Sequence, residues 1–300
     1  MARPLIAAIE TGGSKILCRV AALDAGRHSA FAVRTHRFAT TTPQQAVIDL
    51  VGAIAGDLKP GDTLAAIGLA SFGPLVVDPA SLDLGLMLPT PKPHWSGFNL
   101  AAALAQALGA PVVVETDVAA AAIAEPAIGA AQGLDPVAYV TVGSGIGGGL
   151  CVEGRSLKGA LHPEIGHLRL HRRPGDTAPS ACPFHADCAE GLTAGPALAL
   201  RLAAGQTLTE RPDLRALAAD YLSQLCASLV LAWSPRCIVL GGGVMSTPGM
   251  LREVAAALKM VLGDYGAPMI AGADYLRLPV LEHSGLEGAL LLARREASSQ

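Results

Sequence analysis

The sequence predicts an α/β protein built from two similar units. Short apolar runs typical of buried strands alternate with stretches in which apolar residues recur every three or four positions, as in a helix that covers a sheet. A strand, a glycine-rich turn and a second strand occur twice, around residues 10–15 and around residues 143–149. This repetition favours an α/β fold with ligands at strand ends and between domains.

Local signals place the individual elements. Asn99 is a helix-capping residue type, residues 109–111 stop the same helix, and Pro126 interrupts an alanine-rich helical stretch. The expected strands are residues 5–9, 16–23, 64–70, 112–115, 137–142, 150–152 and 236–240. The expected helices are residues 43–57, 98–108, 118–131, 196–203, 213–233, 248–262 and 287–297.

Length, composition and charge exclude several classes of protein. The 300 residues allow one large domain or two ordinary ones, and 51% of them are apolar, enough for a sizeable core. Lys and Arg number 22 against 25 Asp and Glu, a net charge of −3. This balance argues against a nucleic-acid footprint and provides no polybasic membrane patch.

Neither a membrane span nor a secretion signal is expected. The longest apolar stretches, such as residues 100–114, are interrupted by polar residues, glycine or proline, and none reaches the about 18–20 residues of a span. The N-terminus runs directly into a strand pattern without a signal-peptide layout. The six cysteines are therefore expected to be reduced or metal-bound, in the cytoplasm.

The densest chemical motif lies between His167 and Cys188. Cys182, His185 and Cys188 are three residues apart, and His167 lies fifteen residues before Cys182. Four thiolate and imidazole ligands close a tetrahedral structural zinc site, and a metal would stabilise the proline-rich loop between them. The alternative is two buried cysteines and two surface histidines, but the density of the motif favours zinc.

Two carboxylates flank this motif. Glu164 lies in H-P-E-I-G-H at residues 162–167, and Glu190 follows Cys188 by two positions. A metal-pinned loop would hold both carboxylates beside His167, an arrangement suited to hydrogen-bonding the hydroxyls of a sugar. Solvated surface carboxylates are the alternative, and spacing alone leaves both open.

The glycine-rich turns indicate phosphate binding. E-T-G-G-S-K at residues 10–15 lacks the longer loop and following helix of a P-loop, and a strand rather than a helix follows the turn at residues 143–149. Both turns offer backbone amides to phosphate oxygens, with charge from Lys15, while Glu10 can hold Mg²⁺ through water. Tight hairpins that need positive φ are the alternative, although a third glycine run at residues 241–243 favours phosphate.

Asp117 is the candidate general base. It lies at the end of the strand expected at residues 112–115, between the two glycine turns in the chain. A carboxylate there can take the proton of an attacking hydroxyl. It can also serve as the N-cap of the following helix, and the two roles are compatible.

Taken together, the motifs resemble the ROK family of sugar kinases, and most closely its bacterial fructokinases. In chain order they are E-T-G-G-S-K, S-F-G-P, T-P-K-P-x-W, E-T-D-V, T-V-G-S-G-I-G-G-G, H-P-E-I-G-H, C-P-F-H-A-D-C-A-E-G and L-G-G-G-V-M, spanning essentially the whole chain. The resemblance implies an actin-like ATPase (ribonuclease H-like) two-domain α/β fold with an interdomain cleft, a zinc-stapled loop and a homodimer. It implies an N-terminal α/β domain of residues 1–117 and about 286–300, and a larger α/β domain of residues 118–285 with the zinc loop and nucleotide-binding segments.

The resemblance also implies a role for each matching residue. Asp117 matches the catalytic general base. The sugar-binding positions are Gly73, Pro74, Lys92, Glu164, His167 and Glu190. The ATP-binding positions are Glu10, Gly12, Gly13, Ser14, Lys15, Thr141, Gly143, Ser144, Gly145, Gly147, Gly241, Gly242 and Gly243. The ligands of a structural Zn²⁺ are His167, Cys182, His185 and Cys188, and Mg²⁺ accompanies ATP.

The implied reaction transfers the γ-phosphoryl group of ATP to the 6-hydroxyl of a hexose, first of all D-fructose. Glucose, mannose and N-acetylhexosamines are alternatives that the motifs separate poorly. A sugar-responsive repressor or a non-catalytic sugar sensor is the alternative from another class. A phosphate turn that begins at Glu10 leaves no room for the DNA-binding helices of such repressors, and a sensor is expected to lose Asp117.

Two positions depart from the pattern of the family. Glu10 replaces the Asp common in ROK glucokinases, as it does in similar fructokinases. Ala119 stands where the family usually has a sugar-binding Asn. Loss of a buried donor and acceptor can weaken sugar binding by about 1–3 kcal/mol, so altered sugar choice is expected rather than loss of catalysis.

Overall fold

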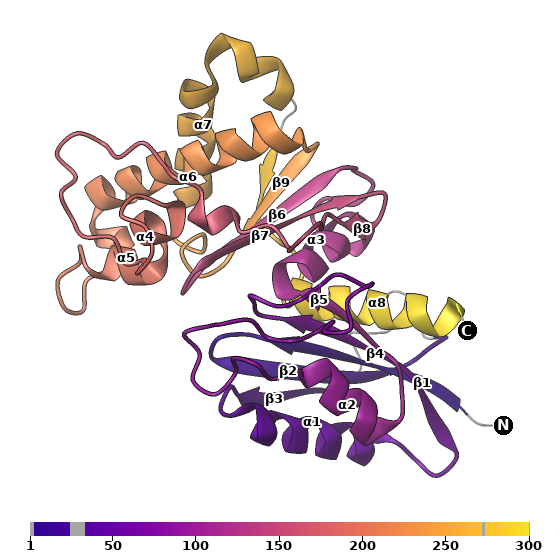
Figure 1. Ribbon diagram of the computed structural model, residues 1–300. Helices are drawn as coiled ribbons and strands as arrows, with labels where there is room; N and C mark the ends of the chain where they lie inside the picture. Colours follow the sequence, from indigo (N-terminus) through magenta and orange to yellow (C-terminus); the bar gives the residue numbers. More distant parts are fainter. Residues whose placement is uncertain (1–2, 25–33, 272–273, 300) are drawn as a thin grey trace. The chain divides into compact units, whose positions relative to one another are not determined.

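The computed structural model describes residues 3–24, 34–271 and 274–299, and two compact units can be distinguished in it (Figure 1). The first comprises Met1–Ala124, Ser156–His162 and Leu281–Gln300, and the second comprises Glu125–Arg155 and Pro163–Val280. Each unit is built around one five-stranded sheet. The functional domain boundaries expected from the sequence stay a prediction.

The first unit has the strand order β3-β2-β1-β4-β5. Its strands are β1 (Arg3–Thr11), β2 (Lys15–Ala22), β3 (Thr35–Ala39), β4 (Asp62–Ser71) and β5 (Val112–Thr116). β2 runs antiparallel to β1 and β3, whereas β1, β4 and β5 run parallel to one another. The carboxyl ends of these three parallel strands therefore lie at one edge of the sheet.

Helices cover both faces of this sheet: α1 (Pro43–Asp57) and α2 (Leu100–Leu108) on one side and α8 (Ser284–Ser299) on the other (Figure 1). Because side chains alternate along a strand, Ile67 and Leu69 of β4 join the core shared with Leu104 of α2. Gly68, between them, faces α8, and a Cβ there would lie 1.9 Å from the carbonyl oxygen of Ala289. This strand thus needs glycine for α8 to approach so closely.

The second unit has the strand order β10-β9-β6-β7-β8. Its strands are β6 (Val137–Val142), β7 (Ile146–Val152), β8 (Arg155–Ser156), β9 (Cys237–Gly241) and β10 (Leu276–Arg277). Its long helices are α6 (Pro212–Trp233) and α7 (Met250–Gly266), which share one apolar core with β6 and β9. Its short helices are η2 (Ile165–His167), α4 (Ala189–Thr193), α5 (Gly195–Ala199), η3 (Leu208–Glu210) and η4 (Ala267–Ile270), while α3 (Asp117–Ile128) begins in the first unit and ends in the second.

The two sheets repeat one strand pattern. In each, an antiparallel hairpin (β1–β2 or β6–β7) is joined by a later strand (β4 or β9) that runs parallel to the first strand of the hairpin. A glycine-rich turn closes both hairpins. The predicted α/β class and the repeated strand–turn–strand unit are therefore confirmed.

The helix signals at Asn99 and at residues 109–111 are confirmed, whereas Pro126 lies inside α3 and does not interrupt it. The side chain of Asn99 accepts a hydrogen bond from the N–H of Ala102 at 2.9 Å, and Gly109 ends α2 with φ of 65°. Both features satisfy backbone groups that a helix end leaves unpaired. The predicted bounds of α1 match the structure at both ends.

Other elements differ from the prediction. β3, β8 and β10 were not expected, because β3 is half-exposed and polar and the other two are only two residues long. The expected helix at residues 196–203 is the shorter α5, and α3 ends at Ile128. The second glycine turn is only residues 143–145, since the following glycines belong to β7, where a Cβ on Gly148 would lie 2.2 Å from Cδ1 of Ile165.

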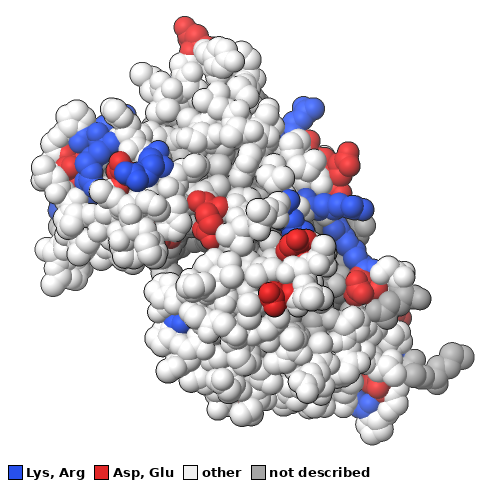
Figure 2. Space-filling model, in the orientation of Figure 1, with Lys and Arg blue, Asp and Glu red and all other residues white. Residues whose placement is uncertain are grey.

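Within the described ranges, α6 is long and apolar enough to span a membrane by length and composition alone. The expectation that no apolar segment is long enough to span a membrane is therefore wrong when only length and composition are considered. Leu222, Leu225 and Leu229 of α6 are at most 1% exposed in the core of the second unit, and this burial accounts for its composition. On the face drawn in Figure 2, acidic and basic side chains lie interspersed, in keeping with the net charge of −3.

Candidate active site and metal centre

The four predicted metal ligands come together in the second unit. His167 ends η2, Cys182 and His185 lie in the following loop, and Cys188 is the N-cap of α4. One ligand atom from each lies within 4.8 Å of all the others. The Sγ atom of Cys182 is 3.8 Å from Nδ1 of His167 and 3.7 Å from Nδ1 of His185.

This geometry fits a tetrahedral zinc ion. Zn–S and Zn–N bonds of ordinary length place sulfur and nitrogen ligands about 3.6 Å apart. Burial raises the pKa of the Cys188 thiol to about 11 in the absence of a metal. A cation is therefore needed for this buried side chain to be a thiolate at neutral pH.

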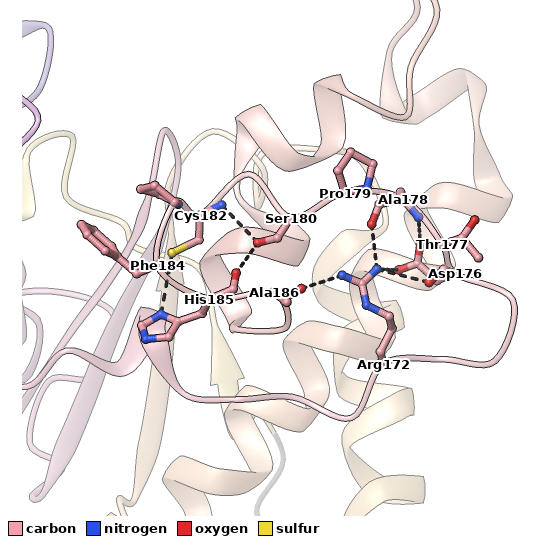
Figure 3. A pocket seen from close by; sticks show the side chains of 11 residues that line it. Arg172, Asp176, Thr177, Ala178, Pro179, Ser180, Cys182, Phe184, His185 and Ala186 are labelled. Atoms are coloured by element: carbon pink, nitrogen blue, oxygen red, sulfur yellow. Dashed lines mark hydrogen bonds and ion pairs between the residues drawn. The ribbon is translucent and has the colours of Figure 1, made fainter.

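The loop between the ligands is also held by contacts that need no metal. The Arg172 guanidinium donates to the carbonyl oxygens of Ala178 at 2.8 Å and Ala186 at 2.7 Å, as Figure 3 shows. Near Cys182, the hydroxyl of Ser180 donates to the carbonyl oxygen of His185 at 2.6 Å. Arg172 thus joins the two arms of the loop, so part of its shape is expected to persist without zinc.

Asp176 connects this loop to the core of the second unit. Its carboxylate accepts hydrogen bonds from the Tyr221 hydroxyl of α6 at 2.7 Å and from Arg201 at 3.0 Å. Burial by itself raises the pKa of Asp176. The hydrogen bonds from Tyr221, Arg201 and the N–H of Ala178, together with the charge of Arg201, outweigh it, so the pKa is lowered from its ordinary value. Only 7% of the Asp176 side chain and 8% of the Arg201 side chain are exposed. Each buried charge is therefore stabilised by the other, and removing one would leave the other unpaired.

Asp176→Asn is expected to lower the free energy of unfolding at pH 7 by about 3 kcal/mol, because Arg201 stays charged and buried without its partner. Since the folded pKa is lowered, the contribution of Asp176 is fully present above its ordinary pKa of 3.8 and is lost as the pH falls through the folded value. Urea denaturation from pH 7 to pH 3 measures both effects. Asp213→Asn, which removes an exposed partner of Arg211, is the control and should change stability little. A difference between wild type and Asp176→Asn that does not shrink at low pH would contradict this account.

In the first unit, strand register brings three candidate segments to one sheet edge. Thr11 of β1 pairs with Ser71 of β4, and Ser71 pairs with Thr116 of β5. The Thr11 hydroxyl donates to Oγ of Ser71 at 3.0 Å. The first glycine turn, the segment with Gly73 and Pro74, and Asp117 all leave the sheet at or next to these aligned residues.

Asp117 is half-buried at the start of α3, where its Oδ1 accepts a hydrogen bond from the N–H of Val118 at 2.9 Å. Thr116, rather than Asp117, accepts the N–H of Ala119 at 3.1 Å, the hydrogen bond typical of an N-cap. The N-cap of α3 is therefore Thr116, and the alternative that Asp117 is the cap is wrong.

Glu10 and the backbone of Asp117 meet the start of α8. Oε2 of Glu10 accepts the N–H of Leu286 at 3.1 Å. A Cβ on Gly285 would lie 2.9 Å from Cδ of Glu10 and 3.2 Å from the carbonyl oxygen of Asp117. Burial raises the pKa of Glu10, with partial compensation from the charge of Lys15. Gly285 is thus required by close packing, and this role could not be predicted because α8 lies far away in the chain.

The first glycine turn presents Gly13 and Ser14 to solvent. The turn is closed by a hydrogen bond from the N–H of Gly12 to the carbonyl oxygen of Lys15 at 2.8 Å. Nζ of Lys92 donates to the carbonyl oxygen of Gly13. The structure therefore brings Lys92, expected near the sugar, to the first turn.

His162 and Trp95 hold the segments around the predicted sugar residues of the first unit. Nε2 of His162 accepts the N–H of Leu75 at 3.3 Å, and a Cβ on Gly73 would lie 3.0 Å from the same nitrogen. Trp95, only 1% exposed, donates from Nε1 to the carbonyl oxygen of Thr41 at 2.8 Å. The positioning role of His162 could not be read from the sequence, since 87 residues separate it from Leu75.

In the second unit, the second glycine turn contacts the segment that follows the metal ligands. The N–H of Ile146 donates to Oε2 of Glu190 at 2.9 Å, and the N–H of Gly195 donates to the carbonyl oxygen of Gly143 at 2.7 Å. Glu190 is half-buried, whereas Glu164, at the start of η2, is exposed. The structure thus pairs Glu190 with the predicted phosphate turn.

The glycines of the turns are not explained by positive φ. Gly12, Gly143 and Gly145 lie outside the left-handed region, so the hairpin alternative with its required positive φ is wrong at these positions. Gly145 is restricted by packing instead, since a Cβ there would lie 2.6 Å from Oε2 of Glu190. Gly143, where an added Cβ would meet no atom within 4 Å, leaves open space beside its backbone.

The third glycine run has mixed surroundings. Gly241 ends β9 and is buried, with a Cβ there only 2.5 Å from the Tyr139 hydroxyl. Gly242 has φ of 91° and packs against the backbone of Val142, while Gly243 is exposed. The absence of a side chain at Gly241 and Gly242 therefore allows the end of β9 to pack closely against β6. Of the three glycines, Gly243 is the exposed one.

The candidate residues form two groups, one in each unit. The first-unit group is Glu10, Gly12, Gly13, Ser14, Lys15, Gly73, Pro74, Lys92 and Asp117. The second-unit group is Thr141, Gly143, Ser144, Gly145, Gly147, Glu164, His167, Cys182, His185, Cys188, Glu190, Gly241, Gly242 and Gly243.

Solved structures with similar folds cover nearly the whole chain. A ROK hexokinase from Thermus thermophilus is 30% identical with a TM-score of 0.74, covering 99% of this chain and 100% of that chain. A ROK family glucokinase from Streptomyces griseus, in complex with glucose and AMPPNP, is 25% identical with a TM-score of 0.74, covering 97% of this chain and 99% of that chain. The predicted actin-like fold is thereby confirmed.

Sequence comparison agrees with the structural similarity. A fructokinase of Zymomonas mobilis is 36% identical over 296 residues, which cover 95% of this chain and 95% of the relative. The sequence model of the ROK family matches residues 6–296. The chain therefore belongs to the ROK family.

Proposed function

We propose that this protein is an ATP-dependent hexose kinase that transfers the γ-phosphoryl group to the 6-hydroxyl of D-fructose. The observation that carries the proposal is the register of Thr11, Ser71 and Thr116, because it brings a glycine turn, the segment with Gly73 and Pro74, and Asp117 to one sheet edge. The fructokinase of Zymomonas mobilis supports fructose as the acceptor. The glucose and AMPPNP of the Streptomyces griseus structure support a sugar and an adenine nucleotide as ligands.

In the first unit, the Asp117 carboxylate accepts the proton of the 6-hydroxyl. At the same time, the oxygen of that hydroxyl forms a bond to the γ-phosphorus. The bond from the γ-phosphorus to the bridging oxygen breaks, and ADP leaves. Gly13 and Ser14 are exposed and offer backbone amides to phosphate oxygens, and Glu10 would hold the Mg²⁺ that neutralises the charge of ATP. Such a reaction depends mainly on alignment and charge neutralisation.

In the second unit, the backbone of residues 143–145 binds phosphate oxygens, and the loop carrying Glu164, His167 and Glu190 binds sugar hydroxyls. Gly73, Pro74 and Lys92 of the first unit border the sugar, and residues 241–243 lie toward the adenosine. His167, Cys182, His185 and Cys188 would hold a zinc ion, and that ion would supply structural rigidity to the loop.

The setting of the enzyme forms part of the proposal. The described cysteines form no disulfide, which supports a reducing compartment such as the cytoplasm. The resemblance to ROK kinases supports a homodimer. Sedimentation velocity of the purified protein measures the oligomeric state directly.

The test of the proposed function is ADP release by the purified protein with Mg-ATP and fructose, glucose, mannose or N-acetylmannosamine. Turnover dominated by fructose is expected. Turnover dominated by another of these sugars would keep the kinase and reassign its acceptor. Sugar binding by a folded, zinc-loaded protein without turnover on any of them would contradict the kinase assignment and favour a sensor.

Ala119→Asn is expected to lower the KM for fructose about tenfold, because the amide restores a hydrogen-bonding group two residues after Asp117. Ala119 is 3% exposed in the first turn of α3, where its N–H bonds to Thr116. Ala119→Val, which adds volume without a polar group, is the matched control and should not lower KM. Steady-state kinetics measure both variants, and an unchanged or higher KM in Ala119→Asn would refute a sugar-binding role for this position.

A further inference from the structure

Glu190 stands between the metal ligands and the second glycine turn. It lies in the first turn of α4, two residues after the ligand Cys188, which caps that helix and accepts the N–H of Gly191 at 3.4 Å. One of its two oxygens, Oε2, accepts the N–H of Ile146 at 2.9 Å. Since Ile146 is only 5% exposed, its N–H has little access to water if this acceptor is removed.

The turn is shaped around this carboxylate. Within the turn, the N–H of Gly143 donates to the carbonyl oxygen of Gly145 at 2.9 Å. Gly145 lies so close to Oε2 of Glu190 that a Cβ would approach it to 2.6 Å. A second hydrogen bond, from Gly195 to the carbonyl oxygen of Gly143, joins the turn to the start of α5. The α4–α5 segment thus fixes both ends of the glycine turn.

We infer that Glu190 is a positioning residue for the phosphates of the bound nucleoside triphosphate, in addition to its proposed contact with the sugar. Its Oε2 atom holds the turn of residues 143–145, and its Oε1 atom remains for a sugar hydroxyl. The loop that binds the sugar therefore also sets the conformation of the turn that binds phosphate. This inference rests on the proposed function, because it assumes that residues 143–145 contact phosphate.

Two substitutions separate the two roles of Glu190. Glu190→Ala removes both oxygens and leaves the N–H of Ile146 without its acceptor. Glu190→Gln keeps an amide oxygen for Ile146 but places a donor where the sugar meets a carboxylate oxygen. Glutamine is therefore expected to preserve the turn and to disturb the sugar contact alone.

The experiment is calorimetric titration of the zinc-loaded protein with Mg-AMPPNP in the absence of sugar. Glu190→Ala is expected to bind the nucleotide about tenfold more weakly than wild type, because a hydrogen bond to a charged group is lost from the turn. Glu190→Gln is expected to bind it within about twofold of wild type while its KM for fructose rises. Glu210→Ala is the matched control, because Glu210 also accepts a backbone N–H, that of Thr207 at 2.8 Å, away from the turn.

Each outcome decides the inference. Thermal denaturation verifies that wild type and Glu190→Ala are both folded. If the two folded proteins then bound the nucleotide equally well, the inference would be overturned and the proposed kinase would remain intact. Equal weakening in Glu190→Ala and Glu190→Gln would also overturn it, since charge rather than the hydrogen bond would then be responsible. Absence of Mg-AMPPNP binding in wild type would refute the proposed function, and the inference with it.

Discussion

Asp117→Asn is expected to lower kcat by about 100- to 10,000-fold, the usual contribution of a positioned general base. Asparagine has the size of aspartate, and its oxygen can still accept the N–H of Val118 that Asp117 Oδ1 accepts at 2.9 Å. It cannot take a proton from a hydroxyl at neutral pH. Steady-state turnover with Mg-ATP and fructose, together with calorimetric fructose binding, measures the effect. Fructose affinity is expected to stay within about threefold of wild type, because charge rather than shape is removed.

Asp135→Asn is the control for this substitution. Asp135 is an exposed carboxylate whose Oδ1 accepts the N–H of Glu153 at 2.8 Å, so the same chemical change is made where no reaction is proposed. This variant should retain full turnover. If Asp117→Asn kept more than about a tenth of the wild-type kcat, a general-base role for Asp117 would be rejected.

Removal of the metal is expected to raise the KM for fructose by more than about tenfold and to lower the Tm, since a bound structural metal contributes its binding free energy to the folded loop. Cys188→Ala tests this without a chelator. Cys188 is fully buried and caps α4, so losing its thiolate removes one of four ligands and loosens the helix that carries Glu190. Atomic absorption should find close to one zinc ion per wild-type chain and almost none in the variant.

The rest of the second unit is expected to stay folded in this variant, because Arg172 and Asp176 hold the loop independently of the metal. Cys226→Ala is the control: this thiol lies in the core on α6, far in sequence from the ligands, and its loss should leave the zinc content unchanged. Full zinc content in Cys188→Ala, or an unchanged KM after complete metal removal, would contradict the assignment.

Local patterns in the sequence predicted much of the fold. Asn99 and Gly109 marked the ends of α2, because capping depends on residues within one turn of the helix end. Apolar runs located β1, β4, β5, β6 and β9, since strands buried on both faces are apolar throughout. The edge strands β3, β8 and β10 escaped prediction because short or half-exposed strands carry too few apolar residues to be recognised.

The candidate site divides in the same way. The spacing of Cys182, His185 and Cys188 predicted a metal cluster, because one loop of that length can wrap an ion. The fourth ligand, His167, was also near enough in the chain to be included. One wrong expectation concerned a distant partner, since Gly145 is restricted by Glu190 rather than by a positive φ. The other was local, since the cap of α3 is Thr116 rather than its neighbour Asp117.

By itself, then, the sequence determined the α/β class, the repeated hairpin, the ends of α1 and α2 and the metal-ligand spacing, all of which depend on neighbours within about twenty residues. Only the tertiary structure decided the alignment of Thr11, Ser71 and Thr116, the contact of Glu190 with Ile146, and the support of Leu75 by His162. The physical reason is that strand register and side-chain packing are set by the summed burial of the whole sheet and core. A local sequence pattern cannot predict which distant backbone N–H a carboxylate or an imidazole will bind, as Glu190 binds that of Ile146 and His162 that of Leu75.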